Sequence, residues 1–92
     1  MKFIVKDKIY DTEKAEKIIE YRKKFKDKFI GFYFYRQTIL YKTNKNNWFS
    51  VSDTDYKKHI ISENTVSEVK EILININDIN KYEKYFGILT EA

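Results

Sequence analysis

The sequence predicts an α+β fold in which helices cover one face of a small antiparallel sheet. Residues 29–43 are rich in aromatic and β-branched side chains, which is typical of strands, and two other segments place apolar residues near helical spacing. With 92 residues, no proline and two glycines, the chain offers no linker and fits a single domain over residues 1–92. The expected order is β-β-α-β-β-(β)-α-α.

The first three elements are predicted from residues 1–26. Residues 1–12 alternate apolar and charged side chains around a charged turn, which predicts a hairpin. Residues 12–26, TEKAEKIIEYRKKFK, place Ala15, Ile18, Ile19 and Phe25 near helical spacing, and we expect a helix there. Asp11 would cap this helix, and its late lysines would suit the negative end of the helix dipole.

Residues 29–43, FIGFYFYRQTILYKT, predict one bent strand or two strands, and the sequence leaves that choice open. NKNN at residues 44–47 predicts a turn, because asparagine tolerates the left-handed conformation. WFSVS predicts the return strand, residues 53–58 another turn, and residues 59–61 a short last strand.

Two C-terminal helices are predicted from their caps. Thr65 and Glu68 have the three-residue spacing of a capping box. Asp78 can cap a second helix that ends after Phe86, with Gly87 as its stop.

The composition argues against catalysis, and we expect a non-enzyme with no cofactor and no metal. The chain has no cysteine and one histidine, which leaves too few ligands for a usual zinc site. His59 is more typical of a structural histidine, and Asp53 with Asp55 is more typical of a polar turn than of a cation site. No apolar run approaches the roughly 20 residues of a membrane span, so we expect a cytoplasmic protein without a membrane partner.

The strongest electrostatic feature is RKKFKDK at residues 22–28. Its net charge of +4 equals that of the whole chain. Such a run can bind phosphates or an acidic protein surface, or it can be a solvated helix end, and the sequence leaves both open. The candidate binding residues are Arg22, Lys23, Lys24, Lys26 and Lys28.

The aromatic hairpin LYKTNKNNWF supplies a second candidate surface. Tyrosine and tryptophan are frequent hot spots at interfaces, but they also form cross-strand pairs that only stabilise a hairpin. The candidate partner-binding residues are Tyr41, Lys42, Trp48, Tyr33 and Tyr35. Tyr82 and Tyr85 could serve a homodimer surface.

Three short motifs in this order, KIYDTEKAEKI, LYKTNKNNWF and YEKYFG, resemble a loose family of small proteins from phages and mobile elements. That family often shows YDT-x-x-A and LYKT-x-x-G-x-[YF]-F. The chain departs from it in having Asn46-Asn47 where the pattern has glycine.

The resemblance implies a setting more than an activity, because proteins of this kind are often non-catalytic inhibitors of host defence. Our first hypothesis is therefore an anti-CRISPR-like inhibitor that binds a CRISPR-Cas effector protein or ribonucleoprotein in the bacterial host cell. The alternative is a small RNA- or DNA-binding regulatory protein of a phage or mobile element.

Overall fold

The structure, a computed structural model, describes residues 1–54 and 58–92. It contains six strands followed by two helices. The elements are β1 (Lys2–Val5), β2 (Lys8–Asp11), β3 (Glu16–Lys26), β4 (Tyr33–Lys42), β5 (Trp48–Asp53), β6 (His59–Asn64), α1 (Val66–Ile76) and α2 (Ile79–Phe86).

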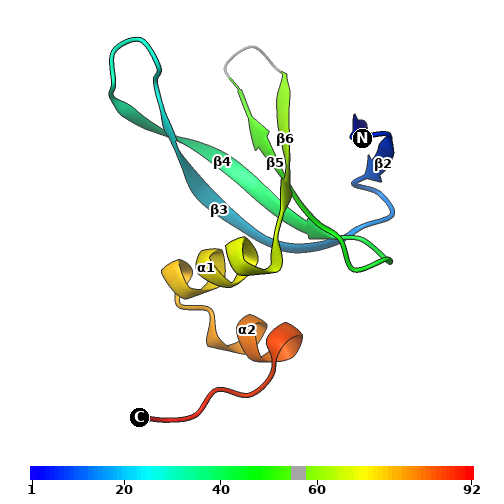
Figure 1. Ribbon diagram of the computed structural model, residues 1–92, viewed down its shortest axis with the longest axis vertical. Helices are drawn as coiled ribbons and strands as arrows, with labels where there is room; N and C mark the ends of the chain where they lie inside the picture. The colour runs from blue at the N-terminus through cyan, green and yellow to red at the C-terminus, as the bar shows by residue number, and fades with distance from the viewer. Residues whose placement is uncertain (55–57) are drawn as a thin grey trace.

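The strands form two antiparallel sheets. β1 and β2 make a hairpin, and β3-β4-β5-β6 make a meander in chain order. The helices lie below the meander in Figure 1 and the hairpin lies at its right. The predicted α+β class is confirmed, with the order β-β-β-β-β-β-α-α.

The predicted helix at residues 12–26 is wrong, because most of this segment forms β3. Ile19, Tyr21, Lys23 and Phe25 alternate along the strand with more exposed residues, and β3 pairs with β4 over almost its whole length. Asp11 caps no helix; its carboxylate accepts the Glu13 N–H at 3.0 Å in the turn before β3. The pairing with an aromatic partner strand outweighs a helix propensity that is only a weak preference.

β4 is one continuous strand, which decides the question that the sequence left open. The β4–β5 hairpin is confirmed, and Asn46 adopts the left-handed conformation with φ 64°. The last strand is confirmed and longer than expected, since it extends to Asn64. Of the predicted turn at residues 53–58, residues 55–57 lie outside the described residues.

The N-terminal hairpin is also confirmed. Val5 pairs with Lys8 across a two-residue turn, and Lys6 and Asp7 both have positive φ, 51° and 62°. This is the geometry that favours hairpins, although asparagine and glycine adopt it more readily than lysine and aspartate.

Both C-terminal helices begin at the predicted caps. The Thr65 side chain accepts the Glu68 N–H at 3.1 Å, and the Glu68 carboxylate accepts the Thr65 N–H at 2.9 Å. The bond from the Thr65 N–H holds the pKa of the Glu68 carboxyl below its ordinary value. Asp78 caps α2 through the Lys81 N–H, and Gly87 follows its last turn.

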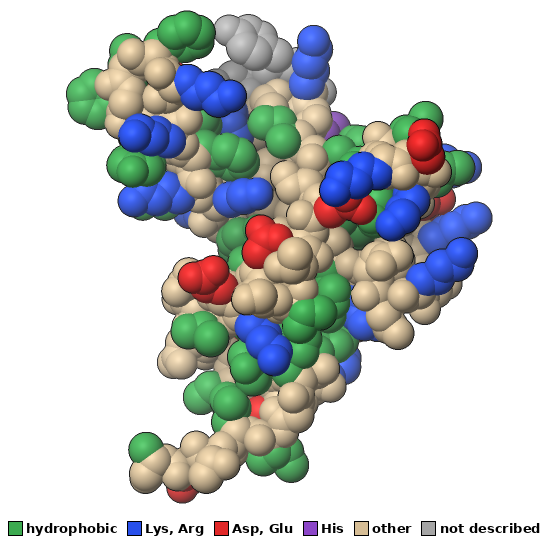
Figure 2. Space-filling model, viewed as in Figure 1, with side chains coloured by type: hydrophobic (Ala, Val, Ile, Leu, Met, Phe, Trp, Pro, Cys, Tyr) green, Lys and Arg blue, Asp and Glu red, His purple; other side chains and the backbone are tan. Residues whose placement is uncertain are grey.

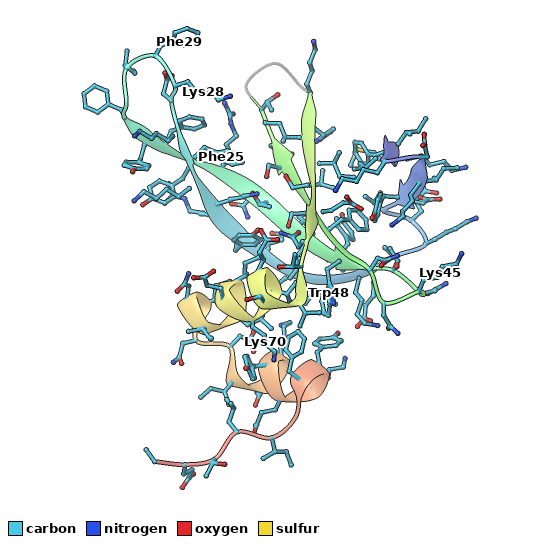
Figure 3. All side chains as sticks on the ribbon, in the orientation of Figure 1. Phe25, Lys28, Phe29, Lys45, Trp48 and Lys70 are labelled. Atoms are coloured by element: carbon cyan, nitrogen blue, oxygen red, sulfur yellow. The ribbon has the colours of Figure 1, made fainter. Side chains whose placement is uncertain are left out.

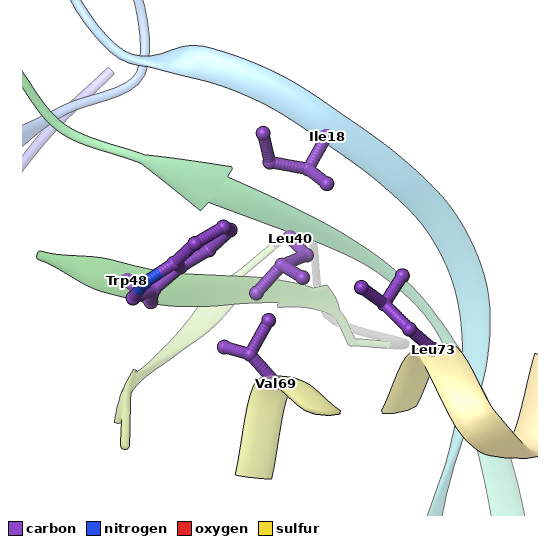
Figure 4. Close-up of a cluster of buried hydrophobic side chains, with 5 residues drawn as sticks. All are labelled: Ile18, Leu40, Trp48, Val69 and Leu73. Atoms are coloured by element: carbon purple, nitrogen blue, oxygen red, sulfur yellow. The ribbon is translucent and has the colours of Figure 1, made fainter. Parts of the chain in front are cut away.

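The core lies on both faces of the meander. On one face Ile18, Leu40 and Trp48 pack against Val69 and Leu73 of α1 (Figure 4). The other face buries a second cluster beneath the N-terminal hairpin: Tyr10, Tyr41, Phe49 and Val51. The fold therefore has three layers, with the meander in the middle.

Candidate nucleic-acid interface

The distal part of the β3–β4 hairpin extends beyond the rest of the sheet. β4 pairs with β5 only from Thr38 to Lys42, so residues 33–37 have β3 as their sheet partner. Figure 1 shows this two-stranded segment reaching away from both helices. We call residues 22–37 the arm.

One face of the arm combines a row of cations with a row of tyrosines. Lys24 is directly opposite Tyr35, and Lys26 is opposite Tyr33. Side chains two residues apart share a face, so Arg22 and its partner Gln37 also lie here, and five of the six residues on this face are cationic or aromatic. We call these the arm face: Arg22, Lys24, Lys26, Tyr33 and Tyr35.

The cations of the arm face lie over its aromatic rings. The Lys24 ammonium is 4.0 Å from the centre of the Tyr33 ring, and the Arg22 guanidinium carbon is 5.0 Å from that of Tyr35. Tyr33 and Tyr35 remain 58% and 52% exposed. Each cation–π contact orders a long side chain against one ring, while both tyrosines stay more than half exposed.

No carboxylate in the described part of the chain forms an ion pair with a cation of the arm face. The same is true of Lys28, next to the turn of the arm. Asp27, the acidic residue of the arm, directs its carboxylate to the N–H groups of Phe29 and Ile30 instead. The positive charge of these four side chains is therefore available to an external anion.

The side chains on the opposite face of the arm make more contacts with β5 and α1. Phe25 and Phe34 stack there with ring centres 5.7 Å apart. Arg36 covers the Phe34 ring and donates to the Asp53 carbonyl, and Lys23 lies close enough to Glu68 to lower its pKa. The arm face therefore makes fewer of these contacts with the rest of the protein than the opposite face does.

A groove of about 580 Å³ separates the base of the arm from α1. Lys23 lines one wall together with Arg22, Lys24 and Tyr35 of the arm face, and Glu68 and Glu71 line the other. Because these carboxylates repel phosphates, they favour anion contacts on the outer part of the arm over contacts within the groove.

The predicted hairpin residues occupy a different part of the fold. Trp48 is 5% exposed and lies edge-on to Tyr85, and Tyr41 is 8% exposed and stacks on Phe49. Lys42, opposite Trp48, is half-buried. Burial leaves Tyr41 and Trp48 little surface to offer a partner. Tyr41 forms a cross-strand pair with Phe49, whereas Trp48 lies on the other face of the sheet and packs against α2, so the two do not form the expected pair with each other.

The five basic residues and the two arm tyrosines come together on one hairpin. Their positions differ from those expected, because a strand sends alternate side chains to opposite faces whereas a helix end would have grouped them. Lys23 therefore separates from Arg22, Lys24 and Lys26. Figure 2 shows the cationic side chains of this region at its upper left, next to apolar ones.

The tyrosines proposed for a dimer surface are half-buried. Tyr82 and Tyr85 pack against the cluster that contains Trp48. The Tyr85 hydroxyl donates to Glu16 at 2.6 Å, and burial together with this bond raises the pKa of Tyr85 to about 12. Both side chains contribute to the attachment of α2 to the sheet.

His59 and Asp53 form an exposed contact, with 3.4 Å between Nδ1 and Oδ1. Asp55, the other half of the acidic pair, lies outside the described residues. Among the residues that the structure does describe, no three potential metal ligands gather. Nor does either described helix have the length and apolar character needed to cross a bilayer.

Sequence reasoning missed the tip of the arm. Phe29 is 98% exposed, and Ile30 and Phe32 are also largely exposed. These residues were assigned to a strand, where apolar side chains suggest burial. Asp27 and Gly31 were the available signals, because an aspartate followed by a glycine is common in turns.

No family model, curated protein sequence or solved structure is detectably similar to this chain. The arm is therefore interpreted from its own geometry and chemistry.

Proposed function

We propose that this protein is a non-catalytic nucleic-acid-binding protein that holds a phosphate backbone on the arm face. The observation that carries the proposal is the row of Arg22, Lys24 and Lys26 beside Tyr33 and Tyr35, on a ribbon that protrudes from the body. Rows of cations beside aromatic rings are how proteins bind single-stranded nucleic acid with little sequence preference, and the cations alone can also bind the phosphates of a duplex.

The spacing of the row supports this function. Residues that share a strand face recur roughly every 6.6 Å, because the rise is about 3.3 Å per residue. Three cations thus extend along the ribbon rather than converging on one point, which suits a linear polyanion better than a single small anion. The tyrosines lie on the neighbouring strand, roughly 4.8 Å away, where they can meet bases or sugars.

The test is direct binding of fluorescently labelled DNA and RNA oligonucleotides, followed by anisotropy. Tyr33→Ala with Tyr35→Ala should weaken binding of single-stranded oligonucleotides, since stacking of an unpaired base on an aromatic side chain contributes about 1–3 kcal/mol per base. The control variant is Tyr82→Phe, which changes a tyrosine outside the arm and should leave binding unchanged. Absence of binding to every oligonucleotide by the wild type would refute the function.

Blocking of a CRISPR-Cas effector in the bacterial cytoplasm is the second candidate. Exposed Tyr33, Tyr35 and Arg22 favour it, because tyrosine and arginine are enriched at hot spots of protein interfaces. It predicts capture of an effector protein that survives nuclease treatment, together with weak binding of naked oligonucleotides. The first candidate predicts the opposite in both measurements.

A further inference from the structure

The tip of the arm carries chemistry that backbone binding does not use. Phe29, Ile30 and Phe32 are largely exposed in the loop at the far end of the ribbon. Figure 3 shows Phe29 and Lys28 at this end of the arm. Exposed apolar clusters often mark interaction sites, so we ask what the cluster at the end of this cationic ribbon binds.

The turn that presents these side chains is held by its own hydrogen bonds. The Asp27 carboxylate accepts the Phe29 and Ile30 N–H groups at 2.8 and 3.2 Å. The Asp27 carbonyl accepts the Gly31 N–H at 3.0 Å, and the Asp27 N–H donates to the Phe32 carbonyl at 2.8 Å. Gly31 has φ 74°, a conformation that glycine adopts without strain. The apolar side chains are thus held in place before any partner arrives, which reduces the entropy lost on binding.

We infer that the arm binds double-stranded nucleic acid and that its tip, led by Phe29, is a wedge that inserts at a base step. This inference rests on the proposed function and names its substrate class. Phenylalanine and isoleucine are among the side chains that separate stacked bases, and the resulting kink brings more of the duplex against the protein.

The charges of the arm favour a duplex over a lipid surface. An interfacial segment enters a membrane by roughly 5–10 Å, and the potential of the membrane falls off within about 8 Å at physiological salt. Arg22 is four residues from Lys26, where β3 ends, roughly 13 Å along the strand, and the turn that contains Lys28 lies beyond that end. A membrane would therefore meet Lys28 and Lys26 and leave Arg22 unused, whereas a duplex can follow the whole row.

The experiment uses a duplex that carries donor and acceptor dyes at its ends and 2-aminopurine at its centre. One titration then reports binding, bending and unstacking. The wild type should bind, bend the duplex by about 20–90° and raise the 2-aminopurine fluorescence.

Phe29→Ala separates the wedge from the backbone contacts. This side chain is 98% exposed, so the variant should fold as the wild type does. It should abolish the bend and the 2-aminopurine signal while changing Kd by at most about tenfold, because the lost contact and the avoided unstacking offset each other. The matched control is Ile88→Ala, which removes an exposed apolar side chain from the C-terminal segment and should change nothing.

Each alternative result is distinguishable. If Phe29→Ala binds the duplex and bends it as much as the wild type does, the wedge is refuted and the proposed function stands. The same conclusion follows if the wild type binds only single strands. Absence of nucleic-acid binding overturns both. Phe29-dependent sedimentation with anionic vesicles, in a protein that binds no duplex, assigns the tip to membranes instead.

Discussion

The salt dependence of binding gives the sharpest test of the arm. Four cations, Arg22, Lys24, Lys26 and Lys28, have no ion-pair partner among the described residues and lie on or next to the arm face. If each contacts one phosphate of a duplex, log Kobs should fall with log salt at a slope of about −3.6, since each contact contributes about 0.9. Affinity should then drop about 150-fold between about 50 and 200 mM salt.

The perturbation is the combined variant Arg22→Gln, Lys24→Gln and Lys26→Gln. Glutamine keeps part of each side chain on the neighbouring ring and removes the charge. One contact should remain, with a slope of about −0.9 and a loss of about threefold over the same range of salt. Anisotropy titrations at four or five salt concentrations give the slope directly.

The matched control removes three charges from the other basic region. Lys2, Lys8 and Lys45 line a separate pocket of about 640 Å³, together with Asp7 and Asp11. Lys45 lies in the β4–β5 turn, away from Phe29 at the tip (Figure 3). Lys2→Gln, Lys8→Gln and Lys45→Gln should leave the slope unchanged. An unchanged slope in the arm variant, or an equal loss in the control, would show that the arm is not the phosphate site.

Three further predictions concern stability. Trp48→Ala should lower the free energy of unfolding by about 3–5 kcal/mol in urea titrations, because this side chain is buried between β5 and α2; a change below about 1 kcal/mol would contradict that placement. Lys6→Asn with Asp7→Gly should raise it by about 0.5–1 kcal/mol, because both positions have positive φ, and a loss of stability would contradict the turn geometry. Glu68→Ala should lower it by about 0.5 kcal/mol at pH 7, when the carboxylate accepts the Thr65 N–H. Because folding lowers the pKa of Glu68, this contribution is present above the ordinary value of 4.5 and is lost as pH falls through the folded pKa; a difference that stays constant with pH would contradict the capping box.

Much of the fold was predictable wherever a local signal had one structural solution. The capping box at Thr65 and Glu68 satisfies helix N–H groups in a way that no strand can use. The NKNN turn lies between two strongly strand-like runs. In both cases local propensity and tertiary structure agree, which is the condition for reliable inference from sequence.

β3 could not be recognised in the same way, because its residues fit two periods. Ile18, Ile19 and Phe25 lie near helical spacing, whereas Ile19, Tyr21 and Phe25 also alternate. Lysine and glutamate at the other positions favour a helix by propensity. The strand is selected by pairing with the aromatic β4, whose partner residues lie from 7 positions away, for Lys26 and Tyr33, to 26 positions away, for Glu16 and Lys42. The periodicity of β3 by itself carries no information about that pairing.

The candidate site shows the same division. Its residue types were visible in the sequence, since the basic run and Tyr33 and Tyr35 were singled out. Their arrangement was not, because it depends on the register that places Lys24 opposite Tyr35. Exposure could not be predicted for Trp48 and Tyr41 either, since it depends on which elements cover each face of the hairpin.

The lysines of β3 have an alternative explanation that a charge reversal can separate from binding. β3 is an edge strand, and lysine on an edge strand opposes pairing with other chains. If Lys24 and Lys26 serve only that purpose, Lys24→Glu with Lys26→Glu should keep the protein monomeric and leave nucleic-acid binding unchanged, because a carboxylate protects an edge as well.

If the arm face binds phosphates, the same variant should remain monomeric by light scattering but lose binding more completely than the glutamine variant, since two attractions become repulsions. A monomeric double glutamate variant that binds as well as the wild type would show that Lys24 and Lys26 only prevent β3 from pairing with other chains. Loss of binding with an unchanged monomer assigns them to the ligand, because edge protection is then intact and only the sign of the charge has changed.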